Sequence, residues 1–130
     1  MKSGNVRNQM VQNEIRFSLE LTIEGSKIAE CKELVQDMVK VVQANEPDTI
    51  NYEYYLNYAE TSCVINEAYK NSEAALAHLK GVASQTILPK IFNISRIARF
   101  DVYGDPSEEL QKVLTTFGAQ LYKLFAGFSR

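Results

Sequence analysis

The stretch INYEYYLNYAETSCVINEAY, residues 50–69, holds two patterns in which apolar and polar side chains alternate, separated by a short polar break. The first pattern runs from Ile50 to Tyr58 and the second from Ser62 to Tyr69. Alternation with a period of two is typical of a β-strand with one buried face, and the break around Glu60 is short enough for a hairpin. We therefore expect two antiparallel strands in the middle of the chain.

A strand and a helix precede this hairpin. Apolar and polar residues alternate from Ile15 to Ile23, which predicts a strand, and Gly25 follows as a strand-ending residue. From Lys27 to Ala44 the apolar residues recur at steps of three and four, as on one side of an amphipathic helix. The segment Asn45-Glu46-Pro47-Asp48 then predicts a turn.

A helix and a strand follow the hairpin. Asn71 or Ser72 can cap a helix that extends to about Val82, and residues 94–103 predict a fourth strand. The segment between them, residues 86–93, contains a proline and is typical of an irregular helical turn. Near the end of the chain we expect a helix with Asp105 as its cap, Pro106 in its first position and Gly118 after it, and then an edge strand over residues 120–125.

The order strand, helix, strand, strand, helix, strand predicts a ferredoxin-like α+β fold, an antiparallel sheet with helices on one face. Such a sheet leaves its other face bare. The large side chains between Tyr52 and Tyr58 favour a partner sheet over water on that face, so we expect a homodimer. Residues 1–14 lack periodicity and predict a mobile arm, whereas residues 15–130 predict one domain.

Composition narrows the function classes. A formal net charge of -2 with scattered basic residues argues against a nucleic-acid partner. No apolar run approaches the roughly 20 residues that span a bilayer, so we expect no membrane partner and a cytoplasmic location. Cys31 and Cys63 each fall on an apolar stripe and are expected to be buried thiols. The single histidine cannot build a conventional zinc site, so we expect no metal.

His78 is the first candidate for chemistry, because no other side chain in the chain has an unperturbed pKa near neutrality. A helical wheel places it at the edge of an apolar face beside Val82, which suits a group half in a pocket or a boundary histidine bound to a backbone carbonyl. Tyr52 and Tyr54 share a strand face and could line a pocket or fill a dimer core. Tyr69 ends the neighbouring strand, where its hydroxyl is expected near the imidazole.

Other polar residues lie inside the expected strands. Asn66 points opposite to Glu67 and Tyr69, so only one of these sets can face a given pocket, and solvent exposure is the alternative for each. Arg96 and Arg99 could stabilise an anion, since a guanidinium stays charged at any working pH, or could form surface ion pairs. We expect these two arginines on opposite faces of their strand.

Several of these segments resemble a known family. Residues 52–55, and residues 67–74 leading to His78, resemble the second strand, third strand and helix of the antibiotic biosynthesis monooxygenase-like domain. Residues 101–107 and 125–130 resemble the C-terminal part of bacterial members regarded as quinol monooxygenases. The resemblance covers roughly residues 15–130. It implies a dimeric α+β barrel that oxidises a small phenolic or quinol-type aromatic with O₂ and without a cofactor.

The resemblance and the residues together lead to specific expectations. His78 is expected to be the general base and Tyr69 to position the substrate, with further substrate contacts from Tyr52, Tyr54, Asn66 and Arg99. Two alternatives stay open. The chain could be a non-catalytic dimeric barrel that binds a small hydrophobic ligand or fills its pocket with its own side chains, or an isomerase that uses the same base without oxygen.

Overall fold

The structure is a computed structural model that describes residues 13–130. All but the last two residues of the predicted arm, residues 1–14, lie outside this range, so the arm stays a prediction. The elements, in chain order, are β1 (Ile15–Ile23), η1 (Gly25–Lys27), α2 (Ile28–Asn45), β2 (Thr49–Leu56), β3 (Ser62–Tyr69), α3 (Ser72–Lys80), α4 (Val82–Thr86), α5 (Leu88–Asn93), β4 (Ser95–Tyr103), α6 (Glu108–Thr116) and β5 (Gln120–Tyr122).

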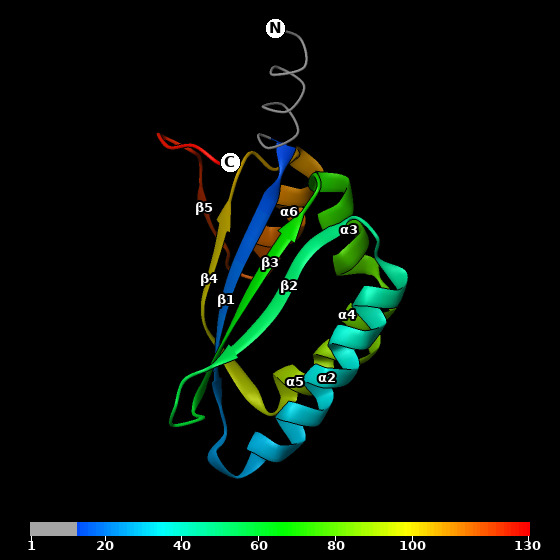
Figure 1. The fold of residues 1–130 in the computed structure, drawn as a ribbon, viewed down its shortest axis with the longest axis vertical. Coiled ribbons are helices and arrows are strands. Elements are labelled where there is room, and N and C mark those ends of the chain that lie inside the picture. The colour runs from blue at the N-terminus through cyan, green and yellow to red at the C-terminus, as the bar shows by residue number, and fades with distance from the viewer. Residues whose placement is uncertain (1–12) are drawn as a thin grey trace, which may run out of the picture.

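The five strands form one sheet in the order β2-β3-β1-β4-β5. The pairs β2 with β3, β3 with β1 and β1 with β4 are antiparallel, whereas β5 joins the edge parallel to β4. The helices lie on one side of this sheet and leave the other side uncovered (Figure 1). The predicted ferredoxin-like α+β fold is confirmed, and so is the edge strand near the C-terminus, which is three residues long.

The core lies between the sheet and the helices. The odd-numbered residues of β1 from Ile15 to Ile23 all face the helices and are buried. From the other side come Met38 and Val42 of α2 and Leu110 and Leu114 of α6, all at most 2% exposed. Burying one such side chain contributes about 1.5 to 3 kcal/mol, which is why the alternating strand pattern fixes which face turns inward. Both cysteines are buried and free, as expected.

Three predicted boundaries need correction. Ser107, not Asp105, caps α6, because its side chain accepts a hydrogen bond from the Leu110 backbone N–H at 3.2 Å. β2 ends at Leu56, and Tyr58 lies in the following turn with its side chain fully in solvent. The helix after β3 ends at Lys80 rather than Val82, and α4 begins as a separate helix after Gly81.

A bulge in β4 overturns the expected orientation of its arginines. Glu20 of β1 pairs with Arg99 and Leu21 pairs with Ile97, so Ala98 is an extra residue in β4. An extra residue reverses the alternation of side chains beyond it. Arg96 and Arg99 therefore both lie on the uncovered face of the sheet, whereas we expected them on opposite faces.

No helix within residues 13–130 combines the length and the apolar character that crossing a membrane requires.

Candidate active site

His78 is buried between the helices and the sheet, with 3% of its surface exposed. Asn71 starts α3, since its side chain accepts a hydrogen bond from the Ala74 backbone N–H at 2.9 Å. His78 then lies one turn beyond Ala74 and Ala75, which are also buried, and so faces the sheet. The expected edge position beside Val82 is wrong, because the helix stops before Val82 and that residue is 66% exposed.

Glu46 holds one side of the imidazole. Its Oε1 lies 2.7 Å from Nδ1 of His78, and the same oxygen accepts a hydrogen bond from the Thr49 hydroxyl at 3.1 Å. Glu46 comes directly after α2, where Pro47 prevents the helix from continuing. A carboxylate beside Nδ1 favours the tautomer with its proton on Nδ1, so Nε2 carries the lone pair that can accept a proton. The Ser84 hydroxyl lies 3.5 Å from Nε2.

Glu67 lies on the other side of the imidazole, in β3. Its Oε1 is 3.5 Å from Nε2 of His78 and accepts a hydrogen bond from the Tyr69 hydroxyl. Glu67 is 7% exposed and Tyr69 is fully buried, with its ring 5.3 Å from the imidazole. The imidazole is thus sandwiched between two carboxyl groups, one from the end of α2 and one from the sheet.

These contacts and the burial of the site shift the pKa values of His78 and Glu67. Burial alone would lower the pKa of His78, but the hydrogen bond to Glu46 and the charges of Glu67 and Glu46 raise it above the ordinary 6.5. Burial raises the pKa of Glu67 above its ordinary 4.5, and this rise outweighs the opposing effects of His78 and the Tyr69 hydrogen bond. A buried carboxyl that holds its proton more tightly can serve as an acid beside the base.

Tyr52 and Tyr54 add a pair of hydroxyl groups on the same face of β2. Their oxygens are 2.8 Å apart, and the Tyr52 ring lies 5.3 Å from the imidazole. Burial raises the pKa of both hydroxyls well above the ordinary value of 10, so both keep their protons. Two hydroxyl groups share one hydrogen bond, so one O–H remains to donate to a bound molecule.

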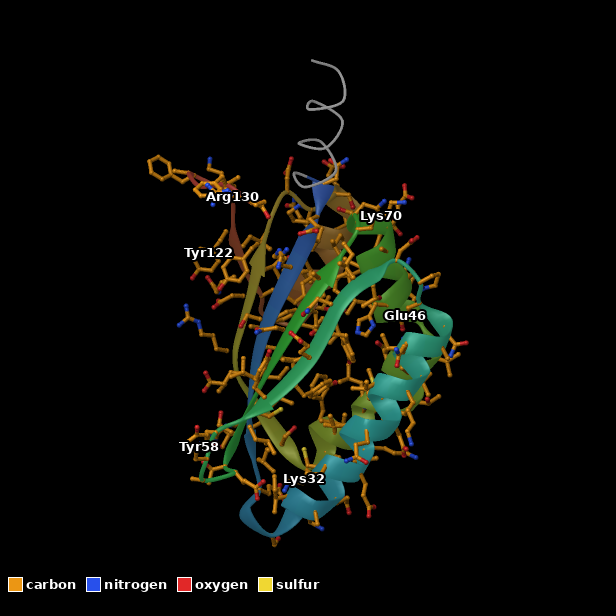
Figure 2. All side chains as sticks on the ribbon, viewed as in Figure 1. Lys32, Glu46, Tyr58, Lys70, Tyr122 and Arg130 are labelled. Carbon is orange, nitrogen blue, oxygen red and sulfur yellow. The ribbon has the colours of Figure 1, made fainter. Side chains whose placement is uncertain are left out.

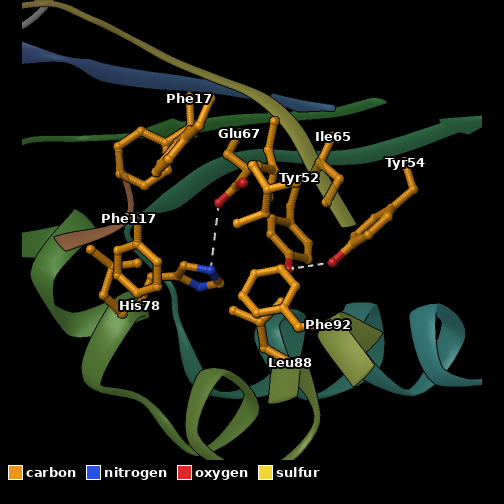
Figure 3. A pocket seen from close by; sticks show the side chains of 13 residues that line it. Phe17, Tyr52, Tyr54, Ile65, Glu67, His78, Leu88, Phe92 and Phe117 are labelled. Carbon is orange, nitrogen blue, oxygen red and sulfur yellow. Dashed lines mark hydrogen bonds and ion pairs between the residues drawn. The ribbon is translucent and has the colours of Figure 1, made fainter. Parts of the chain in front are cut away.

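A small cavity lies beside these groups (Figure 3). Its polar wall consists of His78, Glu67, Tyr52 and Tyr54, and its apolar wall is made by Phe17, Leu19, Ile65, Leu79, Leu88, Phe92, Ile97, Phe100 and Phe117. The volume is about 30 Å³, enough for a water molecule and far below the roughly 300 Å³ of a typical small-molecule pocket. An aromatic ligand can therefore enter only if side chains of the apolar wall move.

The structure brings together three of the six residues expected in the site. His78, Tyr52 and Tyr54 line the cavity. Tyr69 does not line the cavity, and its hydroxyl donates a hydrogen bond to Glu67, which does. Asn66 and Arg99 are on the uncovered face of the sheet and do not contribute to this cavity, because their partners in β1, Ser18 and Glu20, face away from the helices.

Arg99 instead pairs with Asp101, its Nε lying 2.5 Å from Oδ2 of the carboxylate. Tyr122 of β5 projects on the same uncovered side, whereas Glu46 lies among the helices on the other side (Figure 2).

Among residues 13–130, no group of three histidine, cysteine or acidic side chains is placed to hold a metal ion.

Sequence reasoning missed Glu46, and it considered Glu67 but chose Asn66, on the opposite face of the same strand, as the substrate contact. Glu67 had a usable signal, because it alternates in phase with the apolar residues Cys63, Ile65 and Tyr69 and therefore had to face the helices. Glu46 had no such signal, since an acidic residue in a turn is usually exposed to solvent. Its position depends on the end of α2 meeting α3, which no local pattern encodes.

No protein-family model matches the chain. No curated protein matches it either. Solved structures do. MupZ from Pseudomonas fluorescens is 24% identical with a TM-score of 0.77, the match covering 91% of this chain and 95% of that one.

Two further structures share the arrangement of elements. A proposed antibiotic biosynthesis monooxygenase from Caulobacter crescentus is 19% identical, with a TM-score of 0.66 and coverage of 79% of this chain and 99% of that chain. SnoaB, a cofactor-independent oxygenase from Streptomyces nogalater, is 14% identical, with a TM-score of 0.62. The match covers 73% of this chain and 95% of that chain. The chain therefore has the α+β fold of the antibiotic biosynthesis monooxygenase-like proteins.

Proposed function

We propose that the protein is an oxygenase in which His78 removes a proton from a small phenolic or quinol-type aromatic, so that O₂ can oxidise the resulting anion without a cofactor. One observation carries this proposal. Glu46 binds Nδ1 of His78 at 2.7 Å, which leaves Nε2 as a proton acceptor on the wall of an apolar cavity. The fold shared with SnoaB, a cofactor-independent oxygenase, is consistent with it.

The cavity residues suit each stage of such a reaction. A phenol placed between His78 and the Tyr52–Tyr54 pair gives its proton to Nε2, and the free tyrosine O–H donates to the phenolate. The imidazolium that forms is stabilised by the carboxylate of Glu46, which binds Nδ1. The electron-rich anion then transfers an electron to O₂, the radicals combine, and loss of water leaves a quinone. One oxygen atom enters the product and the other leaves as water.

The small volume and apolar wall of the cavity favour this reaction, because they limit the water around the reacting groups. A volume of about 30 Å³ admits water or O₂, and nine of the side chains that form the wall are apolar. Exclusion of water strengthens the hydrogen bonds to an anion and protects reactive oxygen intermediates. The partly exposed Phe117, after α6, is the most accessible of these side chains, which makes it the best candidate for a gate.

Oxygen uptake tests the proposal. Small phenols and hydroquinones are mixed with the full chain in the presence of a chelator, and O₂ consumption is compared for the parent, His78→Gln and Lys80→Gln. Lys80 is the matched control, because it lies on the same helix but pairs at the surface with Glu109. We expect the parent and the control to consume O₂ and His78→Gln to lose about a hundredfold or more. Equal uptake by His78→Gln, or none by the parent with any compound, contradicts the proposal.

A second candidate function is an isomerase. Glu67, whose pKa is raised by burial, and His78 face the same cavity, and such an acid and base can move a proton between two atoms of a substrate. Turnover of a substrate under nitrogen would favour this function. A thermal shift on ligand addition without turnover under either gas would favour the non-catalytic binding protein.

Homodimerisation is part of the proposed function and rests on the uncovered face of the sheet. Tyr55, Tyr103 and Tyr122 are there, between 41% and 52% exposed. The tail adds Leu124, Phe125 and Phe128, all at least 73% exposed. Within residues 13–130, Oδ1 of Asp101 is buried on this face without a hydrogen-bond partner. Such a surface favours a second copy over water.

Sedimentation velocity of the full chain measures the association. We expect a dimer for the parent and a shift toward monomer for Tyr122→Lys, which places a charge on the uncovered face. Val82→Lys, on the helical side, is the control and should stay dimeric. A parent that sediments as a monomer at high concentration contradicts the assembly.

A further inference from the structure

Glu67 is a buried carboxyl group whose burial needs an explanation. A carboxyl group inside a protein costs stability unless it is paired or protonated. Glu67 is 7% exposed and faces inward from the middle strands of the sheet. Its contacts are the Tyr69 hydroxyl and, at 3.5 Å, Nε2 of His78, while part of its side chain forms the wall of the cavity. Figure 3 shows its carboxyl group directly above the imidazole of His78, with a dashed line marking their contact.

The proposed oxygenation needs a proton donor as well as a base. When O₂ has bonded to the ring carbon, the O–O bond must break and its outer oxygen must leave as water rather than as hydroxide. The tyrosine hydroxyls of the cavity are weak acids for this task, since burial raises their pKa. A carboxyl that keeps its proton beyond the usual range is a stronger donor, and burial has this effect on the pKa of Glu67.

We propose that Glu67 is a second catalytic residue, resting on the oxygenase function above, and that it gives a proton to the oxygen atom that leaves as water. His78 first takes the phenol proton and returns it to the peroxide anion, which gives a hydroperoxide. His78 then removes the hydrogen of the ring carbon while the O–O bond breaks and a C=O bond forms. The departing oxygen takes its proton from Glu67.

The contact between Nε2 of His78 and Oε1 of Glu67 closes the cycle. At 3.5 Å, a small movement lets the imidazolium return a proton to the carboxylate. Both groups are then restored, and phenol plus O₂ has become quinone plus water with no proton lost to solvent. Four electrons leave the substrate and reduce the two oxygen atoms. The buried Tyr69 hydroxyl keeps the carboxyl facing His78 and the cavity throughout.

Rapid mixing with α-naphthol separates the two roles. Formation of the naphtholate reports His78, and the later step is followed by quenching and mass analysis for the hydroperoxide, which has the mass of naphthol plus O₂. We expect Glu67→Gln to form the naphtholate at a rate close to that of the parent. Its hydroperoxide should then accumulate, because breakdown to the quinone slows by about a hundredfold or more.

Two further variants sharpen the experiment. Glu67→Asp keeps a carboxyl group and should restore part of the breakdown rate, which also keeps the test informative if Glu67→Gln folds poorly. Glu53→Gln is the matched control, because Glu53 is a glutamate of the neighbouring strand that faces the uncovered side. It should behave like the parent in both steps.

Two results would overturn the role of Glu67. One is breakdown of the hydroperoxide by Glu67→Gln at the rate of the parent. The other is loss of naphtholate formation in Glu67→Gln to the same extent as in His78→Gln, since Glu67 would then only support the base. Failure of the oxygenase function itself is visible separately, because the parent would form naphtholate without any oxygenated product, and the role of Glu67 would fall with it.

Discussion

Nδ1 of His78 lies 2.7 Å from Oε1 of Glu46, although the two residues are 32 positions apart in the chain. This contact joins the end of α2 to α3 and fixes which nitrogen of the imidazole faces the cavity. An imidazole held in this way by a carboxylate is more basic than a free one, and its second nitrogen is available to a substrate. Glu46 thus determines what His78 can do.

The pH dependence of activity should reflect this contact. His78 acts as a base only when it is unprotonated, so kcat/KM should rise as the pH increases through its pKa. Because Glu46 and Glu67 raise the pKa of His78 above 6.5, we expect the acid limb of the profile of the parent to lie above pH 6.5. Glu46→Gln removes a charge and should move that limb to lower pH. An unmoved limb in Glu46→Gln, measured beside Glu53→Gln as the control, contradicts this reasoning.

Tyr69→Phe tests whether Tyr69 acts through Glu67. The change removes the hydroxyl that hydrogen-bonds Glu67 and should cost about 1 to 3 kcal/mol in the free energy of unfolding, measured by urea denaturation. Because Tyr69 does not line the cavity, kcat should fall while KM stays unchanged. Tyr55→Phe is the control, since the Tyr55 hydroxyl bonds Glu53 at the surface. A rise in KM with unchanged kcat would show that Tyr69 contacts the substrate.

Phe117→Ala tests the gate. Phe117 lines the cavity, is 36% exposed and packs edge-on against Phe100 with ring centroids 6.5 Å apart. Its removal should widen the entrance and raise kcat/KM for a bicyclic phenol relative to a monocyclic one by roughly tenfold. Stability should fall by about 1 to 3 kcal/mol. Val82→Ala, at an exposed position on the helical side, should change neither the selectivity nor the stability. Equal selectivity in Phe117→Ala and the parent would place the entrance elsewhere.

Gly81→Ala tests the space that Glu46 occupies. A Cβ atom at Gly81 would lie 2.9 Å from the Ala77 carbonyl oxygen and 3.3 Å from Oε2 of Glu46. We expect a loss of about 1 to 3 kcal/mol in unfolding free energy and, because Glu46 is pushed from His78, a lower pKa of the imidazole by NMR. The one histidine of the chain makes its signal easy to assign. Gly25→Ala is the control, since nothing lies within 4 Å of a Cβ there.

Much of the fold could be predicted because its signals are local. The alternation of apolar and polar residues over 15–23 and 62–69 predicted two strands with their observed boundaries. Apolar residues spaced three and four apart predicted both ends of α2 to within one residue. The errors arose where two local signals compete or a strand is interrupted. Ser107 takes the capping position that Asp105 could also fill, and the extra residue Ala98 in β4 shifts the phase of the alternation between Ile97 and Phe100, which a strand assumed to be regular does not allow for.

The site could be predicted only in part. His78, Tyr52 and Tyr54 are on faces that local periodicity defines, and they do meet at one cavity. Arg99 and Asn66 were expected to contact the substrate, but both lie on the uncovered face of the sheet, away from the cavity. Glu46 reaches His78 only because the end of α2 packs against α3, a tertiary contact between distant segments. The size of the cavity depends on how nine apolar side chains pack, which sequence patterns do not specify.

The proposed oxygenation begins when Nε2 of His78 takes a proton from an aromatic substrate inside the cavity. The most direct measurement is the absorbance spectrum of α-naphthol bound to the protein near neutral pH under nitrogen, where no oxidation can follow. We expect the parent to yield the spectrum of the naphtholate and His78→Gln to yield that of neutral naphthol. Naphthol that stays neutral in the parent although it binds, or that ionises equally in His78→Gln, would contradict the claim.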